Sequence, residues 1–202
     1  MAARSALAWY PDDVWRYVLA CQWQRIDQEE PFPGRCVEAG DDLGSSLVTA
    51  RLVRDLVRLV LLMQRQYPLY SKWLGTAFAR AGAGAQLLPS MTGALAARSW
   101  PEREDCLCAA YEAAARLHNG LGLTGYIDPA VRPSFFDRPY RVLGAARFAE
   151  ALLDGITDDH VRALPPAGAI DQFVDSTDAI NDKALLRDSV SSMIQSRWSP
   201  NP

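Results

Sequence analysis

The amino-acid sequence predicts an all-α protein, an irregular bundle of helices packed around one central, buried helix. Apolar residues recur at intervals of three and four over most of the chain, and prolines and glycines separate these stretches. Of the 202 residues, 49% are apolar and 22% are charged, which is the balance of a globular protein with a sizeable core. Because no internal repeat or low-complexity linker divides the chain, we expect a single helical domain over residues 1–202.

The central helix is expected at residues 45–67. It should end before Pro68, because a residue that precedes a proline disfavours helical backbone. Its apolar side chains cover more than one face, which is typical of a helix that other helices surround. These apolar residues are Leu47, Val48, Leu52, Val53, Leu56, Val57, Leu59, Val60, Leu61 and Met63.

The first helix is expected at residues 12–25, where acidic residues follow Pro11. Pro31, Pro33 and Gly34 then predict an acidic loop before the central helix. A second loop-rich segment is expected near residues 124–142, where short extended pieces also fit. The other helices are expected from residue 71 to the glycines at 82–84, and at residues 87–97, 101–119, 145–153, 158–163 and 181–194.

Composition and charge exclude several classes of protein. A net charge of −3 argues against a nucleic-acid-binding protein, and the longest apolar runs are too short to span a bilayer. Residues 1–7 have no apolar core of a secretory signal, so we expect a soluble, cytoplasmic protein. The cysteines are then expected as buried thiols: Cys21, Cys36, Cys106 and Cys108. No metal site is expected, because Cys106 and Cys108 lack metal-binding spacing and no histidine lies nearby at ligand spacing. No cofactor is expected either, and the sequence contains neither a P-loop nor a dinucleotide-binding motif.

A row of arginines is the strongest chemical signal in the sequence. Arg51, Arg54 and Arg58 share one face of the central helix, with Asp55 beside them. Guanidinium groups are costly to bury without partners, and their planar forks suit sulfate, phosphate or carboxylate groups. Internal ion pairs with nearby acids, an anion-binding site and solvated surface all remain open.

Two further segments offer groups for a ligand. Residues 40–46 form a turn before a helix N-terminus, where Asp42 acts either as a cap or beside a bound anion. Lys72 and Tyr70 lie at a proline-delimited turn. Lys72 there contacts an aromatic face or an anionic ligand, or it is a surface lysine that extends its charge into solvent. His118 and Asn119 end a predicted helix, where His118 is either structural or a proton acceptor and Asn119 a hydrogen-bond donor.

Segments spread over most of the chain carry a family resemblance: residues 14–17, 22–26, 34–35 (which contain Arg35), 40–45, 51–55 and 70–78. Further matches in character are Arg103-Glu104, His118-Asn119, Arg138-Pro139 and Asp171-Gln172-Phe173. On these segments the chain resembles a bacterial family with a domain of unknown function, in which a nucleotidyltransferase-like domain comes first and a helical domain second. The paired aspartates of a nucleotidyltransferase centre do not precede Asp12, so the resemblance implies a separately encoded partner subunit.

The chain is also similar in size to the small subunit of two-protein enzymes of azinomycin-type antibiotic biosynthesis, which close an aziridine ring by sulfate elimination. This resemblance implies a heterodimer that binds a small sulfated amine. The anion would lie on Arg35, Arg51, Arg54, Arg58 and Lys72, with Tyr70 and Asn119 as donors, and His118 or Asp42 would act as catalytic groups. An accessory half of a split nucleotidyltransferase and a non-catalytic interaction module are the alternatives. A helical subunit that needs a partner is expected to expose an apolar face.

Overall fold

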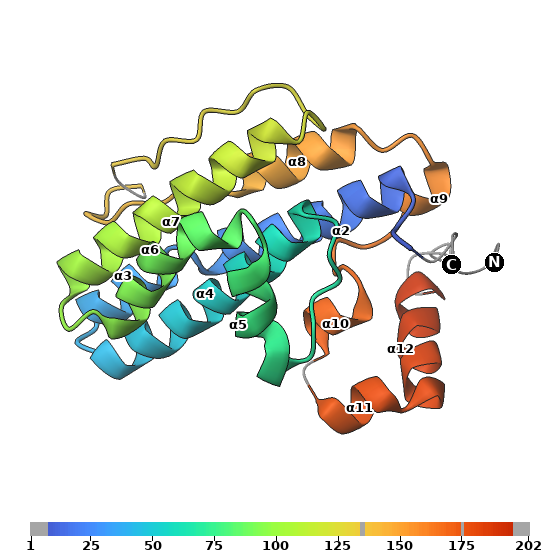
Figure 1. Cartoon of the computed structure of the whole chain (residues 1–202), viewed down its shortest axis with the longest axis horizontal. Coiled ribbons are helices and arrows are strands. Elements are labelled where there is room, and N and C mark those ends of the chain that lie inside the picture. The colour runs from blue at the N-terminus through green and yellow to red at the C-terminus, as the bar shows by residue number, and fades with distance from the viewer. Residues whose placement is uncertain (1–7, 134–135, 175, 196–202) are drawn as a thin grey trace, which may run out of the picture.

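The computed structural model describes residues 8–133, 136–174 and 176–195 of the chain. Residues 1–7, on which the argument about a secretory signal rests, lie outside this range. The expected all-α fold is confirmed, because helices make up most of the described residues and no sheet forms among them (Figure 1). Among the described residues, Arg132 and Val142 form an isolated antiparallel β-bridge.

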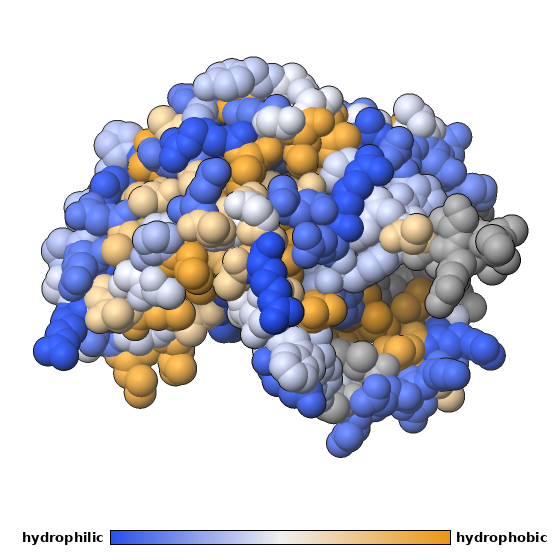
Figure 2. Space-filling model, viewed as in Figure 1, coloured by the Kyte–Doolittle hydropathy of each residue, from blue (hydrophilic) through white to orange (hydrophobic). Residues whose placement is uncertain are grey.

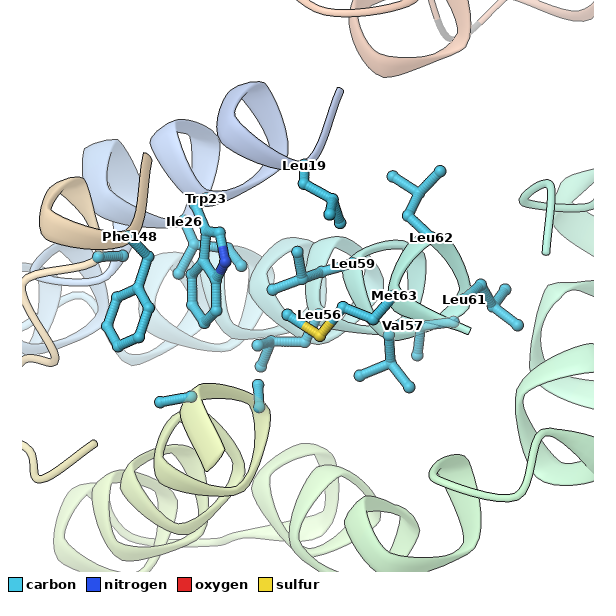
Figure 3. Packing of buried hydrophobic residues seen from close by; sticks show 14 of the residues in the cluster. Leu19, Trp23, Ile26, Leu56, Val57, Leu59, Leu61, Leu62, Met63 and Phe148 are labelled. Atoms are coloured by element: carbon cyan, nitrogen blue, oxygen red, sulfur yellow. The ribbon is translucent and has the colours of Figure 1, made fainter. Parts of the chain in front are cut away.

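The central helix α4 (Asp42–Met63) packs against four neighbouring helices and a short one. These are α2 (Asp12–Glu29), α5 (Ser71–Arg80), α6 (Gly84–Ala96), α7 (Trp100–Gly120) and the short α3 (Phe32–Glu38). The second half of α4 is buried on nearly every side, as its apolar sequence predicts. Figure 3 shows Trp23 and Ile26 of α2 turned toward Leu56 and Leu59 of α4. The core therefore surrounds α4 and extends from α2 into α6 and α7.

The helices after residue 145 first pack on the bundle and then form a group at one end of it. Helix α8 (Ala146–Asp154) lies along α2, and α9 (Asp159–Arg162) packs against the start of α2. Figure 1 shows the remaining helices as a group at one end of the bundle. These helices are α10 (Ile170–Phe173), α11 (Thr177–Asn181) and α12 (Lys183–Gln195).

Helices α3 and α4 differ from the elements that the sequence predicts there. Helix α3 occupies the expected acidic loop, because Pro31 is its N-cap and Pro33 lies in its first turn, where a missing N–H costs no hydrogen bond. Helix α4 begins at Asp42 and ends at Met63, one turn before Pro68. Its C-terminal turn breaks at Arg65, whose φ of 53° is left-handed and whose guanidinium lies 4.3 Å from the Trp15 ring.

The loop-rich segment near residues 124–142 is confirmed, and two acids at the C-terminal end of α2 bind the residues that follow it. The Glu30 carboxylate accepts hydrogen bonds from the backbone N–H groups of Leu143, Gly144 and Ala145 at 2.6–3.0 Å. The Asp27 carboxylate accepts another from the N–H of Ala146 at 2.9 Å. These bonds satisfy free donors at the start of α8, and burial raises the pKa of Glu30 to about 7.

All four cysteines are free thiols; Cys21 and Cys108 are buried, and Cys36 and Cys106 are partly buried. Burial raises the pKa of both Cys21 and Cys108 to about 12, so neither thiol is reactive. In the part of the chain that the structure describes, the helices are too short or too polar to cross a bilayer.

Candidate functional site

The predicted row of arginines lines a polar pocket of about 440 Å³ between α2, α4 and α10. Arg51, Arg54 and Arg58 reach it from α4 with the helical spacing that places them on one face. Arg25 reaches it from the end of α2, and the wall across from α4 is the segment from Asp171 to Val174. Two helices therefore bring four guanidinium groups together, and the segment that contains α10 forms the wall across from α4.

Three of these arginines form ion pairs with carboxylates at or beside the pocket. Arg51 pairs with Glu29 of α2. Arg25 Nε lies 3.5 Å from Asp55 Oδ1. The internal pairing that the sequence left open therefore occurs, although Arg51 keeps 60% of its side chain exposed at the pocket edge.

Arg58 connects α4 to the wall formed by residues 171–174. Its guanidinium donates to the backbone oxygen of Asp171 and lies 3.6 Å from the Asp171 carboxylate. Because its side chain is only 10% exposed, Arg58 needs such a partner. Asp171 keeps 31% of its side chain exposed and Asp55 only 4%, so Asp171 is the more accessible carboxylate in the pocket.

A buried amide network holds α10 in place beneath the pocket. Gln172 donates to the backbone oxygen of Val18 and to the side-chain oxygen of Gln22, both at 3.0 Å. Gln22 in turn donates to Asp55 Oδ1 at 3.1 Å. Since Gln22 and Gln172 are both buried, this network positions Asp55 and the 171–174 wall relative to each other.

The electrostatics of the pocket favour an anion. Four arginines and two aspartates line it, so the lining carries net positive charge. Burial raises the pKa of the neighbouring Glu29, whose carboxylate pairs with Arg51. Guanidinium forks bind the oxygens of sulfate, phosphate or carboxylate groups with two hydrogen bonds each. The exposed carboxylate of Asp171 can bind a positive group of the same ligand.

His118 does not line this pocket and is fully buried in the core. Its Nδ1 accepts a hydrogen bond from the indole N–H of Trp23 at 3.1 Å, and its Nε2 lies 3.0 Å from Thr124 Oγ1. Thr124 donates its own proton to the Gly125 oxygen, so it accepts from His118 and the neutral Nε2–H tautomer is favoured. Burial lowers the pKa of His118 to about 4. This environment suits a structural histidine.

Asp42 also lies outside the pocket, at the start of α4. Its carboxylate is 3.1 Å from Nη1 of the buried Arg103, which bonds Ser45 as well. The helix cap is Asp41, whose side chain accepts from the N–H of Gly44 at 2.7 Å. The expectation that Asp42 caps this helix is therefore wrong, because the helix begins at Asp42 and its N-cap is the preceding residue.

The other predicted ligand-binding residues are dispersed. Lys72 lies over the rings of Tyr70 and Trp73 at 5.9 and 5.5 Å, which is the aromatic contact that the sequence allowed. Asn119 exchanges two hydrogen bonds with the backbone of Ile127 and so anchors the loop after α7. Arg35 lies 5.8 Å from the Phe32 ring on α3. The structure therefore brings together Arg51, Arg54 and Arg58 and does not add these four residues to their pocket.

Sequence reasoning did not assign Arg25, Asp171 or Gln172 to the site. Arg25 lies one helical turn after Gln22 on α2, which is a weak local signal. Asp171 and Gln172 stand out only as part of the family resemblance. Their place beside α4 follows from long-range docking of α10, which local patterns do not reveal.

Comparison with known proteins gives one match. Residues 1–74 match the model of a family described as "Domain of unknown function (DUF4037)". The matched segment contains the arginines of α2 and α4, whereas the α10 wall of the pocket lies beyond it. No curated protein and no solved structure matches the chain.

Proposed function

We propose that this chain is the small subunit of a heteromeric natural-product biosynthetic enzyme and that its arginine pocket binds a small sulfated amine. One observation carries the proposal: Arg25, Arg51, Arg54 and Arg58 converge from two helices on one pocket that also contains Asp171. The sulfate group would displace carboxylates from these guanidiniums. A carboxylate released in this way is then available to the ligand's ammonium group.

The reaction that fits this placement is closure of an aziridine ring with sulfate elimination. The amine nitrogen forms a bond to the carbon that carries the sulfate ester, the C–O bond breaks, and sulfate leaves with the electron pair. The proton of the ring nitrogen passes to a base. The arginines stabilise the charge of the leaving sulfate, and the pocket holds the amine in line for attack. Asp171 replaces His118 and Asp42 as the proposed proton acceptor, because it lines the pocket.

A separately encoded partner subunit, in a heterodimer, completes the proposed enzyme. Arg51 lies at the edge of the pocket with much of its side chain in solvent, so a partner can approach the ligand from that side. Closure by a partner would exclude water and strengthen the interaction of the arginines with the sulfate group.

The accessory half of a split nucleotidyltransferase is the second candidate. The match of residues 1–74 to a domain-of-unknown-function family agrees with the resemblance that suggests it. The same arginines would then bind the phosphate groups of a nucleotide that the partner holds with Mg²⁺. A non-catalytic interaction module would use the pocket for neither purpose.

The first experiment compares chemical denaturation of the parent chain and Arg54→Ala in sodium sulfate and in sodium chloride of equal ionic strength. A ligand that binds the native state at a hundredfold excess over Kd adds about 2.7 kcal/mol of stability. Sulfate also stabilises proteins generally by exclusion from their surface. Arg80→Ala, on the exposed end of α5, is the matched control and should keep the full sulfate effect. Equal sulfate effects in the parent and in Arg54→Ala would refute the anion site.

The second experiment reconstitutes the chain with the product of an adjacent gene and follows candidate substrates by mass spectrometry. Arg54→Ala should lower turnover about tenfold or more, or about 1.4 kcal/mol in the activation free energy, while the complex still assembles. Sulfate release from a sulfated amine supports the first candidate, and nucleotide transfer supports the second. Full turnover by the partner alone would refute both.

A further inference from the structure

The two facing walls of the arginine pocket differ in chemistry. The α4 wall carries the row of arginines. The wall across from it, residues 171–174, ends in two apolar residues, Phe173 and Val174, which also line the pocket. Phe173 is 36% exposed, although an aromatic side chain contributes most to stability when it is buried. The pocket therefore has a basic side and a partly apolar side.

Docking of α10 on the bundle does not use these two apolar side chains. The side chain of Gln172 and the guanidinium of Arg58 connect this helix to the bundle by hydrogen bonds. Among the described residues, the hydrophobic core and the side chains packed against it contain neither Phe173 nor Val174. In the view of Figure 2, hydrophobic surface also lies beside α10, in the hollow between the bundle and the helices α11 and α12. Phe173 and Val174 are therefore apolar groups that a ligand in the pocket can contact.

The buried amide of Gln172 fixes how its two neighbours are placed. Its side chain points into the bundle, where it is 4% exposed. Because a helix has about 3.6 residues per turn, the residues before and after it project to its two sides. Asp171 and Phe173 therefore flank Gln172 in the same pocket wall. This wall offers a carboxylate on one side and an aromatic ring on the other, across from the arginines.

The size of the pocket also indicates more than an inorganic anion. Its volume of about 440 Å³ lies within the range of about 300–1,000 Å³ that is usual for small-molecule sites. A sulfate ion on the arginines fills only a small part of this volume. The remaining space adjoins the 171–174 wall. An apolar group placed there removes its own surface and that of Phe173 from water, which favours binding.

We infer that the pocket binds an amphipathic sulfate ester and that Phe173 selects it by packing on an apolar group of its carbon skeleton. This inference rests on the anion site of the proposed function and narrows its ligand to a sulfated amine with an apolar substituent. The arginines hold the sulfate group, Asp171 the ammonium group, and Phe173 and Val174 the apolar group. Because Phe173 contacts the ligand away from the reacting bonds, it determines affinity and specificity and has no catalytic role.

Two sulfate esters of equal charge, ethyl sulfate and phenethyl sulfate, test this inference, because they differ only by a phenyl ring. Each is titrated into the ¹⁵N-labelled chain, and Kd is obtained from the arginine Nε–Hε signals in nuclear magnetic resonance spectra. The parent should bind phenethyl sulfate about tenfold more tightly than ethyl sulfate. Phe173→Ala should reduce this preference to about threefold or less and leave the Kd of ethyl sulfate unchanged within about twofold. Tyr126→Ala, which removes an exposed aromatic side chain outside the pocket, should keep the full preference.

The outcomes separate this inference from the proposed function. Arg54→Ala should weaken the binding of both esters by the same factor, because the arginine contacts the sulfate group that they share. Equal affinity of the parent for the two esters, or a preference that survives in Phe173→Ala, would refute the inference and leave the anion site in place. Loss of ethyl sulfate binding in Phe173→Ala would also refute it, since the side chain would then support the pocket itself. No saturable binding of either ester or of inorganic sulfate would refute the anion site and the inference together.

Discussion

Two regions flank α2 and use polar groups in opposite ways. At the α2–α7–α8 contact, His118 packs with the stacked rings of Trp23 and Phe148, whose centroids lie 4.6 Å apart. At the α2–α4–α10 contact, four arginines surround an open pocket. His118 is neutral and has hydrogen bonds at both ring nitrogens. The arginines are charged, and part of their surface faces the pocket.

This difference separates a structural polar group from a ligand-binding one. The histidine has apolar neighbours and fixed local partners, so its burial specifies how three helices pack. Four arginines and two aspartates line the pocket, so the charge of its lining favours an anion. In a sequence, a titratable residue at a helix end and a row of arginines on a helix face are equally good candidates for a functional site. Their surroundings in the fold assign them different roles.

The largest expected loss of stability comes from a substitution at the α2–α7–α8 contact. Trp23→Ala removes a fully buried ring that stacks on Phe148 and donates to His118. The free energy of unfolding should fall by about 3–5 kcal/mol, as measured by urea denaturation. The additional stability that sulfate gives should remain, because the pocket does not contain this residue. Loss of the sulfate effect in a folded Trp23→Ala chain would show that the two regions are not independent.

The next effect is a pH dependence that His118 creates. Its folded pKa of about 4 is below its ordinary value of 6.5, so the native state resists protonation. The stability that neutral His118 contributes is fully present above pH 6.5 and is lost as the pH falls toward 4, by up to about 3 kcal/mol. His118→Gln should remove this loss in denaturation curves measured at pH 7 and pH 4.5. Glu30, with its raised pKa, is present in both proteins and cancels in the comparison. Identical pH profiles would contradict the assignment.

A smaller expected effect concerns Gln172, whose substitution should lower both the free energy of unfolding and the stabilisation by sulfate. Gln172→Ala leaves the backbone oxygen of Val18 and the side chain of Gln22 without their buried donor, which should cost about 1–3 kcal/mol. Because Gln172 holds the 171–174 wall, the sulfate effect should also weaken. The measurement is urea denaturation with and without sulfate. A full sulfate effect in Gln172→Ala would mean that α10 is not part of the anion site.

The sequence predicts the helices well where apolar periodicity is strong. Residues 12–25 and 101–119 lie within α2 and α7, and the buried character of α4 follows from its apolar residues. Helix α3 is not predicted, because two prolines and Gly34 indicate a loop. The glycine at position 34 is explained by tertiary packing, since a Cβ there would lie 2.6 Å from the Tyr140 ring.

In the candidate site too, some residues could be predicted from local sequence patterns and others could not. The arginine row follows from spacing on one helix, so Arg51, Arg54 and Arg58 could be predicted together. Asp171 contacts Arg58, which lies 113 residues earlier in the sequence. This contact requires α10 to dock on the bundle, and the docking depends on hydrogen bonds of Tyr17, Gln22 and Gln172. Such contacts are set by the packed fold and have no local pattern. Conversely, His118 and Asn119 are polar residues at a helix end, and only their bonds to Trp23 and Ile127 reveal structural roles.

The most direct test of the central claim observes the arginine side chains during a sulfate titration. In nuclear magnetic resonance spectra of the ¹⁵N-labelled chain, single Arg→Lys variants assign the Nε–Hε signals of Arg25, Arg51, Arg54 and Arg58. The account predicts that these signals shift together with one saturable binding curve, while the indole N–H signal of Trp23, bonded to His118, does not move. Uniform small shifts of all arginines without saturation, or a shift of the Trp23 signal instead, would contradict it.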